Sequence, residues 1–279
     1  MSTPVNQIPT SSLHLKEAKE IGRGSYATVY QMTWNRQLGP IQVAAKRLNK
    51  PEDDTELKIL SKLDHPNIVK LLGVVDEGIN FLLILELCEG GSLRKYLDGH
   101  QDNHLPTDQF FDWAKQAALP VQYLQENNIV HKDIKSPNIL ISKENILKLA
   151  DFGLAKNIAE SISNATQTAS YPWMAPELLY KAILSPTFDI FTLGVVFWEL
   201  WTRQFPFKGV EWEQIVWKVC EKDERLPIPP DMPKSLADLI RQCWATDCKQ
   251  RPGIQHILDE VSDACNALTT VRHVSLRGK

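Results

Sequence analysis

Short runs of apolar and β-branched residues, separated by Gly, Pro and Asn, occupy the first third of the chain. Runs of this length and composition are typical of β-strands. The predicted strands cover residues 27–30, 41–45, 68–72 and 81–85. One window differs, because Leu57, Leu60 and Leu63 repeat at helical spacing and predict a helix over residues 52–63.

Beyond Gly91 the apolar positions recur at helical spacing over most of the remaining sequence. The predicted helices cover residues 92–97, 107–127, 187–202, 212–220, 235–244 and 254–266. Two short predicted strands, 138–141 and 146–149, interrupt them. The pattern predicts an α+β protein, in which a small antiparallel-sheet lobe with one main helix precedes a larger, mainly helical lobe.

This division gives four segments. The Ser, Thr and Pro content of the first residues predicts a flexible arm over residues 1–14. The strand-rich lobe is expected over 15–87, the helical lobe over 88–266 and a C-terminal tail over 267–279. Residues 85–92 would join the two lobes.

Composition and charge exclude several classes of function. The chain has 279 residues, of which 43% are hydrophobic and 23% charged, and its net charge is −3. Without a basic surplus, binding to nucleic acid or to an anionic membrane is not expected. The most apolar stretch, residues 190–201, is too short to span a bilayer and contains Thr192 and Glu199. The N-terminus lacks a signal-peptide pattern, so we predict a soluble cytoplasmic protein without membrane insertion.

Five cysteines are present, an odd number without the spacing of a disulfide framework. Cys243 and Cys248, with His256 downstream, are a candidate zinc set, but no matching second pair follows them. We interpret the cysteines as reduced thiols packed in the core of an intracellular protein.

A glycine-rich segment near the start of the strand-rich lobe is the first candidate binding feature. Gly22 and Gly24 precede Ala27, the third small residue, and Val29. Glycine lets the backbone turn sharply and approach phosphate groups without interference from a Cβ. A dinucleotide-binding turn has the same spacing but requires a helix directly afterwards. Residues 28–31 favour a strand instead, so a phosphate-binding hairpin is the preferred interpretation.

A lysine and a glutamate form the second feature. Lys46 ends an apolar strand, where a lysine is usually just solvated, but an ammonium buried there needs a counter-charge. Glu56 lies on the following predicted helix and fits its leucine pattern, and Glu52 is the competing candidate. Held by Glu56, Lys46 would direct its charge at the α- and β-phosphates of a nucleotide.

The most specific string is His-Lys-Asp-Ile-Lys-Ser-Pro-Asn at residues 131–138. Asp133 can accept the proton of a substrate hydroxyl, and Lys135 can neutralise charge on the transferring group. Asn138 and the later Asp151, which begins an Asp-Phe-Gly string, can hold Mg²⁺. Each polar residue alone could cap a loop, but their order behind a glycine loop and a strand lysine indicates phosphoryl transfer.

With these strings, the sequence resembles the eukaryotic protein kinase family over about residues 15–265. Ala-Pro-Glu at 175–177 matches the end of the family's activation segment, and Arg251 is expected to pair with its glutamate. Residues 188–194 match a buried helix of the family, in which Asp189 would brace the catalytic loop. The resemblance implies the bilobal kinase fold, with ATP and Mg²⁺ as cofactors.

The resemblance also implies a nucleotide pocket between the lobes. Leu85 would lie beside the adenine, and backbone groups of Glu86 and Cys88 would bond it. The full expected set is Ile21, Gly22, Gly24, Ala27, Val29, Ala44, Lys46, Leu85, Glu86, Cys88 and Leu140. An apolar spine between the lobes is expected from Leu60, Leu71, His131 and Phe152. By residue type alone, these side chains fit an ordinary core equally well.

Finer features place the sequence within the family. Lys135 is the choice of Ser/Thr kinases, and Ser170 lies where these enzymes carry a hydroxyl that contacts the catalytic aspartate. Residues 171–177 and 195–200 resemble the tyrosine-kinase-like group. Within it, residues 224–229 and the short lysine-to-helix connection resemble the mixed-lineage kinases, especially the zipper and sterile-alpha-motif branch.

Kinases of that branch act as MAP kinase kinase kinases, which implies MAP kinase kinases as protein substrates and allows dimerisation for activation. The main rival is a pseudokinase or scaffold with the same fold. Such relatives usually lack a central catalytic residue, whereas Lys46, Asp133 and Asp151 are all present here. Tyrosine phosphorylation is a third hypothesis.

Two departures from the family pattern concern regulation. Lys132 stands where the family usually has Arg, and Ala169 where glycine is common. Arginine grips a phosphate through two hydrogen bonds, whereas lysine offers a point charge. The candidate phosphorylation sites are Ser161, Ser163, Thr166, Thr168 and Ser170. We expect phosphate at Thr166 or Thr168 to order this segment against Lys132 and other bases, and a solvated Ser/Thr loop is the alternative.

Overall fold

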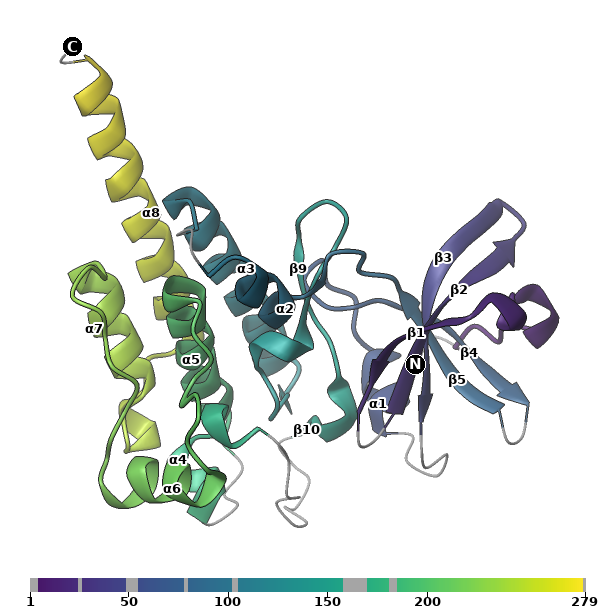
Figure 1. Cartoon of the computed structure of the whole chain (residues 1–279), viewed down its shortest axis with the longest axis horizontal. Coiled ribbons are helices and arrows are strands. Elements are labelled where there is room, and N and C mark those ends of the chain that lie inside the picture. Colours follow the sequence, from purple (N-terminus) through teal and green to yellow (C-terminus); the bar gives the residue numbers. More distant parts are fainter. Residues whose placement is uncertain are drawn as a thin grey trace.

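A computed structural model describes residues 5–24, 27–48, 55–77, 80–101, 105–157, 170–180 and 185–277. Strands from the first third of the chain gather at one end of the molecule, and most of the helices lie at the other end (Figure 1). This two-lobed arrangement confirms the predicted α+β fold class.

The strand-rich lobe is an antiparallel sheet with the strand order β1-β2-β3-β5-β4. Its strands are β1 Lys19–Arg23, β2 Ala27–Arg36, β3 Gly39–Leu48, β4 Leu71–Glu77 and β5 Asn80–Glu86. Gly39 closes the β2–β3 hairpin with φ +105°, a conformation that a residue with a side chain rarely adopts. The register places Val29 opposite Lys46 and Ala44 opposite Leu85.

Helix α1 (Thr55–Leu60) buries Glu56, Ile59 and Leu60. Glu56 and Leu60 are one turn apart, so the face that the leucine pattern predicted is the face that carries the glutamate inward. The first predicted helical residues, 52–54, lie outside the described part of the chain.

The strand predicted over residues 68–72 is displaced, because β4 covers Leu71–Glu77. Residues 67–69 pair instead with β9 (Leu147–Leu149) of the helical lobe. Val69 N donates to the Leu149 carbonyl at 2.9 Å, and Leu149 N donates to the Asn67 carbonyl at 2.8 Å. The first residues of the apolar run therefore connect the two lobes, and only its end, from Leu71 onward, belongs to the sheet.

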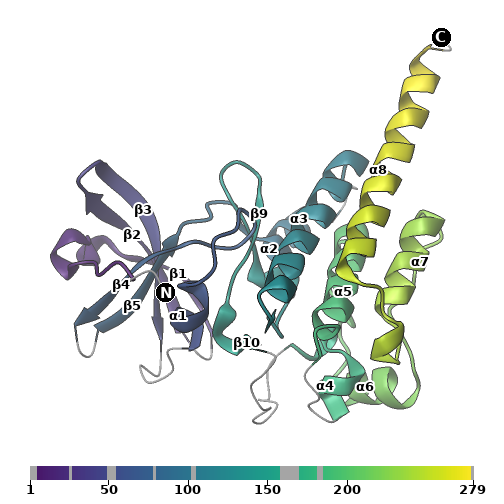
Figure 2. The same ribbon diagram turned by 180° about the vertical axis from the view of Figure 1, so that it is seen from behind.

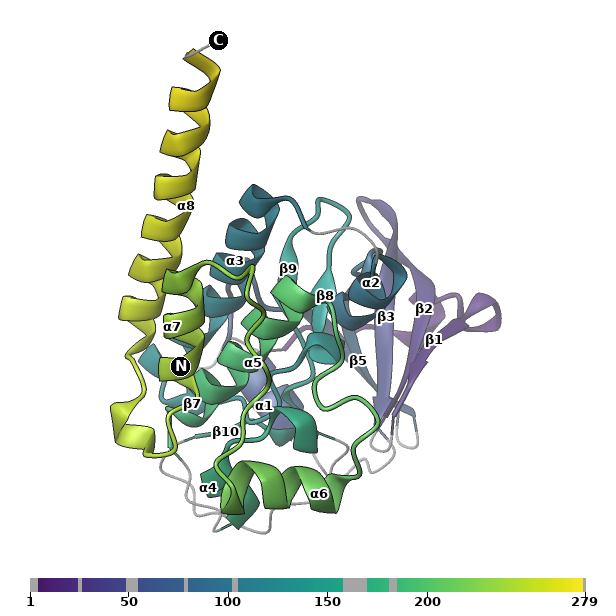
Figure 3. The ribbon, with the colours of Figure 1, turned by 60° about the vertical axis from the view of Figure 1, so that its left-hand side comes forward.

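The helices of the second lobe pack around α5, which is buried from Phe188 to Leu200 (Figure 3). They are α2 Leu93–Gly99, α3 Thr107–Glu126, α4 Pro176–Tyr180, α5 Phe188–Thr202, α6 Trp212–Val216, α7 Lys234–Cys243 and α8 Ile254–Arg277. Gly194 lets α7 approach α5 closely, since a Cβ there would lie 2.7 Å from the Cβ of Cys243. Cys243 is thus a packing thiol in this contact.

Short strands complete the helical lobe next to the junction. They are β6 Gly91–Ser92, β7 Ile129–Val130, β8 Ile139–Ile141, β9 Leu147–Leu149 and β10 Lys156–Asn157. Strands β6, β8 and β9 form one antiparallel sheet, and β7 pairs with β10. The segment from β7 to β10 contains Asp133, Lys135, Asn138 and Asp151. Its two ends pair with each other, and its middle is held by the β8–β9 pairing.

Two helices of the second lobe differ in length from the prediction, and in the first lobe α1 ends at Leu60, three residues before its predicted end. The helix expected over 212–220 is α6 followed by a π-helical turn at Trp217–Glu221. Helix α8 continues to Arg277 and projects beyond the lobe, so much of the tail expected over 267–279 is helical (Figure 2). The sequence from Ile254 to Arg277 contains neither Gly nor Pro, so no backbone signal ends the helix earlier.

The N-terminal arm that we expected to be flexible packs on the sheet from residue 5 onward. Ile8 N donates to the Val74 carbonyl at 2.8 Å, and Val74 N donates to the Asn6 carbonyl at 2.9 Å, beside the edge strand β4. Ile8 and Leu13 are only 4% and 6% exposed. They cover the sheet face opposite α1 together with Met32, Val43, Ala45, Val75, Leu82 and Ile84. Two apolar side chains among polar residues therefore anchor this arm.

We expect Gly73→Ala to lower the free energy of unfolding by about 1–3 kcal/mol, because the added methyl overpacks the arm. Its Cβ would lie 2.5 Å from the Asn6 carbonyl oxygen and 2.7 Å from the side chain of Ile8. Chemical denaturation measures the change, and Gly99→Ala is the matched control because nothing lies within 4 Å of its Cβ. In a chain that begins at Leu15 the Gly73→Ala cost should disappear, and an equal cost there would contradict the prediction.

Candidate active site

Lys46 and Glu56 form a buried ion pair at the junction of the lobes. Lys46 follows the buried residues 43–45 on β3, and its Nζ lies 2.5 Å from Oε2 of Glu56 on α1. The predicted lysine–glutamate contact is therefore present, and the competing residue, Glu52, lies outside the described part of the chain. A buried ion pair is stable only when both charges keep their partners, so β3 and α1 are held in one arrangement.

Asp151 approaches the same ammonium from the helical lobe. Its Oδ1 lies 2.8 Å from Nζ of Lys46, and its side chain is 50% exposed. Burial acts to lower the pKa of Lys46, but Glu56 and Asp151 outweigh it and raise that pKa. Burial acts to raise the pKa of Asp151, and the Lys46 charge outweighs it and lowers that pKa. The lysine therefore stays protonated and Asp151 stays ionised beside it.

The backbone of Asp151 is held in a rare conformation by the residue that follows it. Asp151 has φ +65° and ψ 72°, in the left-handed region that a residue with a side chain seldom adopts. Phe152 is fully buried, and its ring packs edge-on against His131 at a centroid distance of 4.6 Å. The aromatic anchor fixes the turn and directs the carboxylate of Asp151 to Lys46.

Asp189 supports the loop that carries Asp133. It lies at the start of α5, and its carboxylate accepts hydrogen bonds from the backbone N–H groups of His131 at 2.7 Å and Lys132 at 3.0 Å. Lys132 has φ +70°, so this contact also supports a strained backbone. The expected bracing role of Asp189 is confirmed by this geometry.

Asp133 lies at the centre of a polar cluster on the catalytic loop. Its Oδ2 accepts a hydrogen bond from Nδ2 of Asn138 at 2.7 Å and is 2.8 Å from Nζ of Lys135. Its Oδ1 accepts a hydrogen bond from Oγ of Ser170 at 2.6 Å, and Lys135 Nζ donates to the same hydroxyl at 2.6 Å. The contact between Ser170 and Asp133, expected from the resemblance, is present.

Five of the residues expected to form the adenine pocket belong to the main apolar core or pack against it. Leu85 ends a buried run on β5, Ala44 lies opposite it on β3, and Cys88 follows β5. Val29 and Leu140 are half-buried on β2 and β8. Burial raises the pKa of the Cys88 thiol to about 12, so it is protonated.

The glycine-rich segment is described on both sides of its tip. Ile21 is exposed, Gly22 pairs with Val29 across the β1–β2 hairpin, and Gly24 N donates to the Ala27 carbonyl at 2.9 Å. Residues 25–26 lie outside the described part of the chain. The strand after the glycines agrees with the phosphate-binding hairpin and not with the dinucleotide-binding turn.

The side chain of Glu86, at the end of β5, connects the lobes. Its Oε1 accepts a hydrogen bond from Lys70 N at 2.8 Å and lies 2.9 Å from Nζ of Lys148 on β9. Lys148 Nζ also donates to the Pro66 carbonyl at 3.0 Å. The side chain of Glu86 contacts Lys70 and Lys148, and in this way it holds in place the backbone groups that are expected to bond adenine.

The donor set fits a nucleotide with a divalent cation. Asp151 presents a half-exposed carboxylate, an oxygen ligand of the kind that hard cations prefer. Asn138 uses its amide nitrogen to bond Asp133, which leaves its carbonyl oxygen for coordination. Lys46 adds a fixed positive charge between two carboxylates, as an anionic phosphate chain requires.

Sequence reasoning missed a buried cluster around Glu199. This residue on α5 is fully buried and bonds Arg94, Ser136 and Trp173. In the sequence it was only a polar interruption of the most apolar stretch. A charge inside a helix that is otherwise apolar on all sides is the signal that could have found it.

Arg251 and Glu177 form the ion pair that the resemblance implied. Two guanidinium nitrogens donate to the two carboxylate oxygens at 2.5 and 2.7 Å. Arg251 Nη1 also donates to the Thr187 carbonyl, just before α5. The pair ties helix α4, after the activation segment, to the C-terminal part of the lobe.

A lysine held by a glutamate on a helix, beside an aspartate that can bind a metal, is the arrangement that protein kinases use to hold ATP. A family model described as protein tyrosine and serine/threonine kinase matches residues 15–261. The chain belongs to this family, whose members use ATP and a divalent metal.

Named relatives within the family are MAP kinase kinase kinases. Mitogen-activated protein kinase kinase kinase dlk-1 of Caenorhabditis elegans is 34% identical over 246 residues, covering 87% of this chain and 26% of the relative. Mitogen-activated protein kinase kinase kinase 12 of Rattus norvegicus is 32% identical, covering 85% and 26%. Mitogen-activated protein kinase kinase kinase 13 of Bos taurus is 30% identical, covering 88% and 24%. The chain thus spans about a quarter of the length of these relatives.

Within the described ranges, the longest helices are too polar or too short to cross a membrane.

The buried imidazole of His131 gives a pH prediction. Burial lowers its pKa to about 4, whereas an unfolded histidine titrates near 6.5. Between these values the unfolded chain binds more protons, so this residue's contribution to stability is complete above about pH 6.5 and is lost as the pH falls.

We therefore expect the difference in unfolding free energy between wild type and His131→Phe to fall by about 2 kcal/mol from pH 7 to pH 5. Phenylalanine keeps an aromatic ring against Phe152 but does not titrate. Denaturation curves at several pH values measure the difference, with the exposed His256→Gln as control. A constant difference across this range would contradict the prediction.

Proposed function

We propose that this chain transfers the γ-phosphoryl group of ATP to Ser or Thr hydroxyls of protein substrates. The observation that carries the proposal is the cluster in which Asp133 contacts Asn138, Lys135 and Ser170, together with the Lys46–Asp151 pair. No single residue of this set is diagnostic, but their combined placement from both lobes matches the requirements of phosphoryl transfer.

Each side chain has a defined task in this proposal. Asp133 orients the acceptor hydroxyl and takes its proton while the new oxygen–phosphorus bond forms, and ADP leaves as the old bond breaks. Lys135, which already contacts Asp133, offsets negative charge on the transferring group. Lys46, fixed by Glu56, positions the α- and β-phosphates. Asn138 and Asp151 would hold Mg²⁺, which neutralises phosphate charge when bound.

The preference for Ser and Thr over Tyr rests on Lys135 and Ser170. Both side chains contact Asp133 directly, and together they occupy the space beside the proton acceptor. A short aliphatic hydroxyl can approach Asp133 beside them. Phosphoamino-acid analysis distinguishes this proposal from tyrosine phosphorylation.

MAP kinase kinases are the proposed protein substrates. The relatives named above are called mitogen-activated protein kinase kinase kinases, and they match this chain over most of its length. Sequence identities of 34%, 32% and 30% to these relatives support the same class of substrate for this chain. Cytoplasmic localisation and dimerisation for activation stay predictions from the sequence.

We expect Lys46→Met and Asp151→Asn each to reduce phosphate transfer from MgATP to casein or to a panel of MAP kinase kinases by about a hundredfold or more. The first change removes the charge that contacts both carboxylates, and the second removes a metal-binding oxygen. Lys115→Met, at an exposed position on α3, is the matched control and should keep wild-type activity. Equal, background-level transfer by wild type and Asp151→Asn would favour the pseudokinase or scaffold.

We also propose that phosphate in the activation loop regulates the site. The candidate residues Ser161, Ser163, Thr166 and Thr168 lie outside the described part of the chain. Burial, followed by the nearby charge of Lys156, lowers the pKa of Lys132. Two cations close together favour binding of an anionic group between them.

Incubation with MgATP followed by phosphopeptide mapping should find phosphate between residues 157 and 170, with Thr166 or Thr168 as the main site. Thr166→Ala or Thr168→Ala should then reduce activity severalfold, and Lys132→Ala should make activity independent of that phosphate. The matched control is Ser262→Ala, on α8. No phosphate in this range, with transfer to casein intact, would contradict the proposal.

A further inference from the structure

The N-terminal arm is bonded to two separate strands of the sheet in the small lobe. At the edge strand β4, Ile8 N donates to the Val74 carbonyl at 2.8 Å, and Val74 N donates back to the backbone of the arm at 2.9 Å. Farther along the arm, His14 N donates to the Thr33 carbonyl of β2 at 3.0 Å. Because β3 and β5 lie between β2 and β4, the arm spans most of one sheet face.

Few side chains hold the arm in this position. Within residues 5–14, only Ile8 and Leu13 are buried, and the residues between them are half-buried or exposed. The burial of two apolar side chains favours docking, whereas the ordering of the whole segment opposes it. Segments with few buried contacts open more easily than the core beneath them. The arm can therefore leave the sheet without unfolding of the lobe.

Val74 connects the arm to the ion pair of the active site. Its register partner is Leu83 on β5, and Leu83 in turn is opposite Lys46 on β3. Val74 and Leu83 are only 2% and 0% exposed, and both belong to the apolar core that includes Leu60 of α1. Leu60 is one turn after Glu56, the partner of Lys46. The strand that binds the arm is thus part of the same cross-strand row as the lysine.

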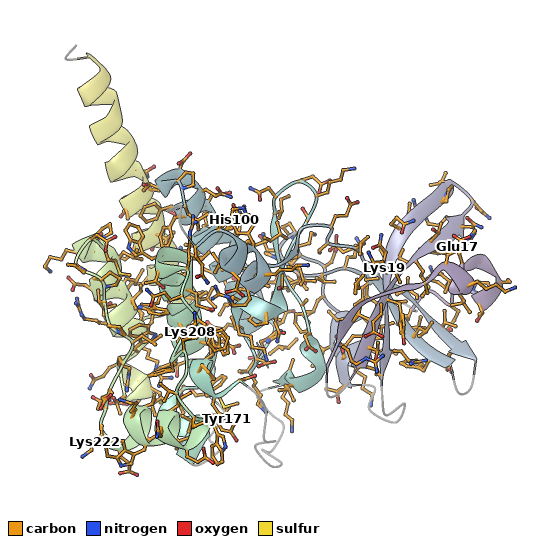
Figure 4. The ribbon with its side chains drawn as sticks, in the orientation of Figure 1. Glu17, Lys19, His100, Tyr171, Lys208 and Lys222 are labelled. Carbon is orange, nitrogen blue, oxygen red and sulfur yellow. The ribbon has the colours of Figure 1, made fainter. Side chains whose placement is uncertain are left out.

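The arm itself is remote from the chemistry. It covers the sheet face opposite α1, whereas Lys46 contacts Glu56 of α1 on the other face. Figure 4 places Glu17, just after the arm, at the outer end of the small lobe and far from Tyr171 of the helical lobe. Any effect of the arm on the reaction must therefore act through the sheet.

We propose that the arm is a regulatory strap, which when docked on β4 holds the row Val74–Leu83–Lys46 against α1 and keeps the Lys46–Glu56 pair intact. Withdrawal of Ile8 from the sheet lets this pair loosen and weakens the binding of nucleotide phosphates to Lys46. The inference goes beyond the proposed kinase function, on which it rests for its activity readout. Coupling between two sites is reciprocal, so nucleotide binding must in turn hold the arm docked.

The reciprocal effect can be measured on the wild-type chain without any phosphate transfer. Hydrogen exchange of the Ile8 and Val74 amides, which both bond across the arm–β4 contact, is followed by NMR with and without Mg²⁺ and the non-hydrolysable ATP analogue AMP-PNP. We expect the analogue to slow both amides by about fivefold or more. Amides of α7 are the control and should exchange at an unchanged rate. Calorimetry under the same conditions shows whether the analogue binds.

The second test is Ile8→Ala, with Leu258→Ala on α8 as the matched control. The two side chains are 4% and 6% exposed, so both truncations should lower the melting temperature. We expect only Ile8→Ala to raise the KM for ATP, by about fivefold or more, with the KM for casein unchanged. Ile8→Leu keeps an apolar anchor and should retain the wild-type KM. Should Ile8→Ala fail to fold, Leu13→Ala removes the other anchor and is expected to have the same effect.

The outcomes distinguish this inference from the proposed function. If wild type does not exceed Asp151→Asn in transfer to casein, the kinase proposal fails, and the exchange experiment still decides whether the strap is coupled to the nucleotide. If AMP-PNP binds without slowing exchange at Ile8 and Val74, the strap is wrong. It is equally wrong if wild type is active but truncation of either anchor leaves the KM for ATP equal to that of Leu258→Ala.

Discussion

The burial of helix α5 is the constraint on which the rest of the site depends. An apolar helix is favoured in the centre of the lobe, but its carboxylates, Asp189 and Glu199, are stable there only with hydrogen-bond donors. Asp189 obtains them from the backbone of the catalytic loop, and Glu199 from the loop, α2 and the end of the activation segment. The folding of the core therefore already fixes the relative placement of the segments that carry the chemistry.

At the junction between the lobes, which lies nearer to solvent, buried charges again need partners. Lys46 comes from β3, Glu56 from α1 and Asp151 from the turn after β9, so three elements are tied by one ammonium group. Displacement of β3 or α1 would separate the buried Lys46–Glu56 pair, at a cost of several kcal/mol, whereas the half-exposed Asp151 could regain water. Phe152 packs against His131 beside this contact and adds an apolar link of the same kind. Electrostatics and packing thus favour a single arrangement of the two lobes.

The sequence predicted well the features that local residues decide. The hairpin β2–β3, helices α3 and α5 and the lysine–glutamate pair follow from periodicity and from the need of a buried charge for a partner. Predictions failed where a distant partner decides. Residues 68–69 lie in a predicted strand but pair with β9 of the other lobe, and the polar N-terminal arm is held because Ile8 and Leu13 complete a sheet face. The local sequence around each segment does not reveal these partners, because β9 and the sheet strands are far away along the chain.

The carboxylates of the site also show why residue type alone does not reveal a role. Asp151 is half-exposed and can reach a ligand, whereas Glu199 is 0% exposed and meets only protein donors. Asp133 lies between these cases: it is buried and bonded to three side chains, yet Ser170 connects it to the turn Tyr171–Trp173. In the sequence all three are acidic residues beside apolar runs. Accessibility, which depends on the whole fold, decides which of them meets the substrate and which only holds the others in place.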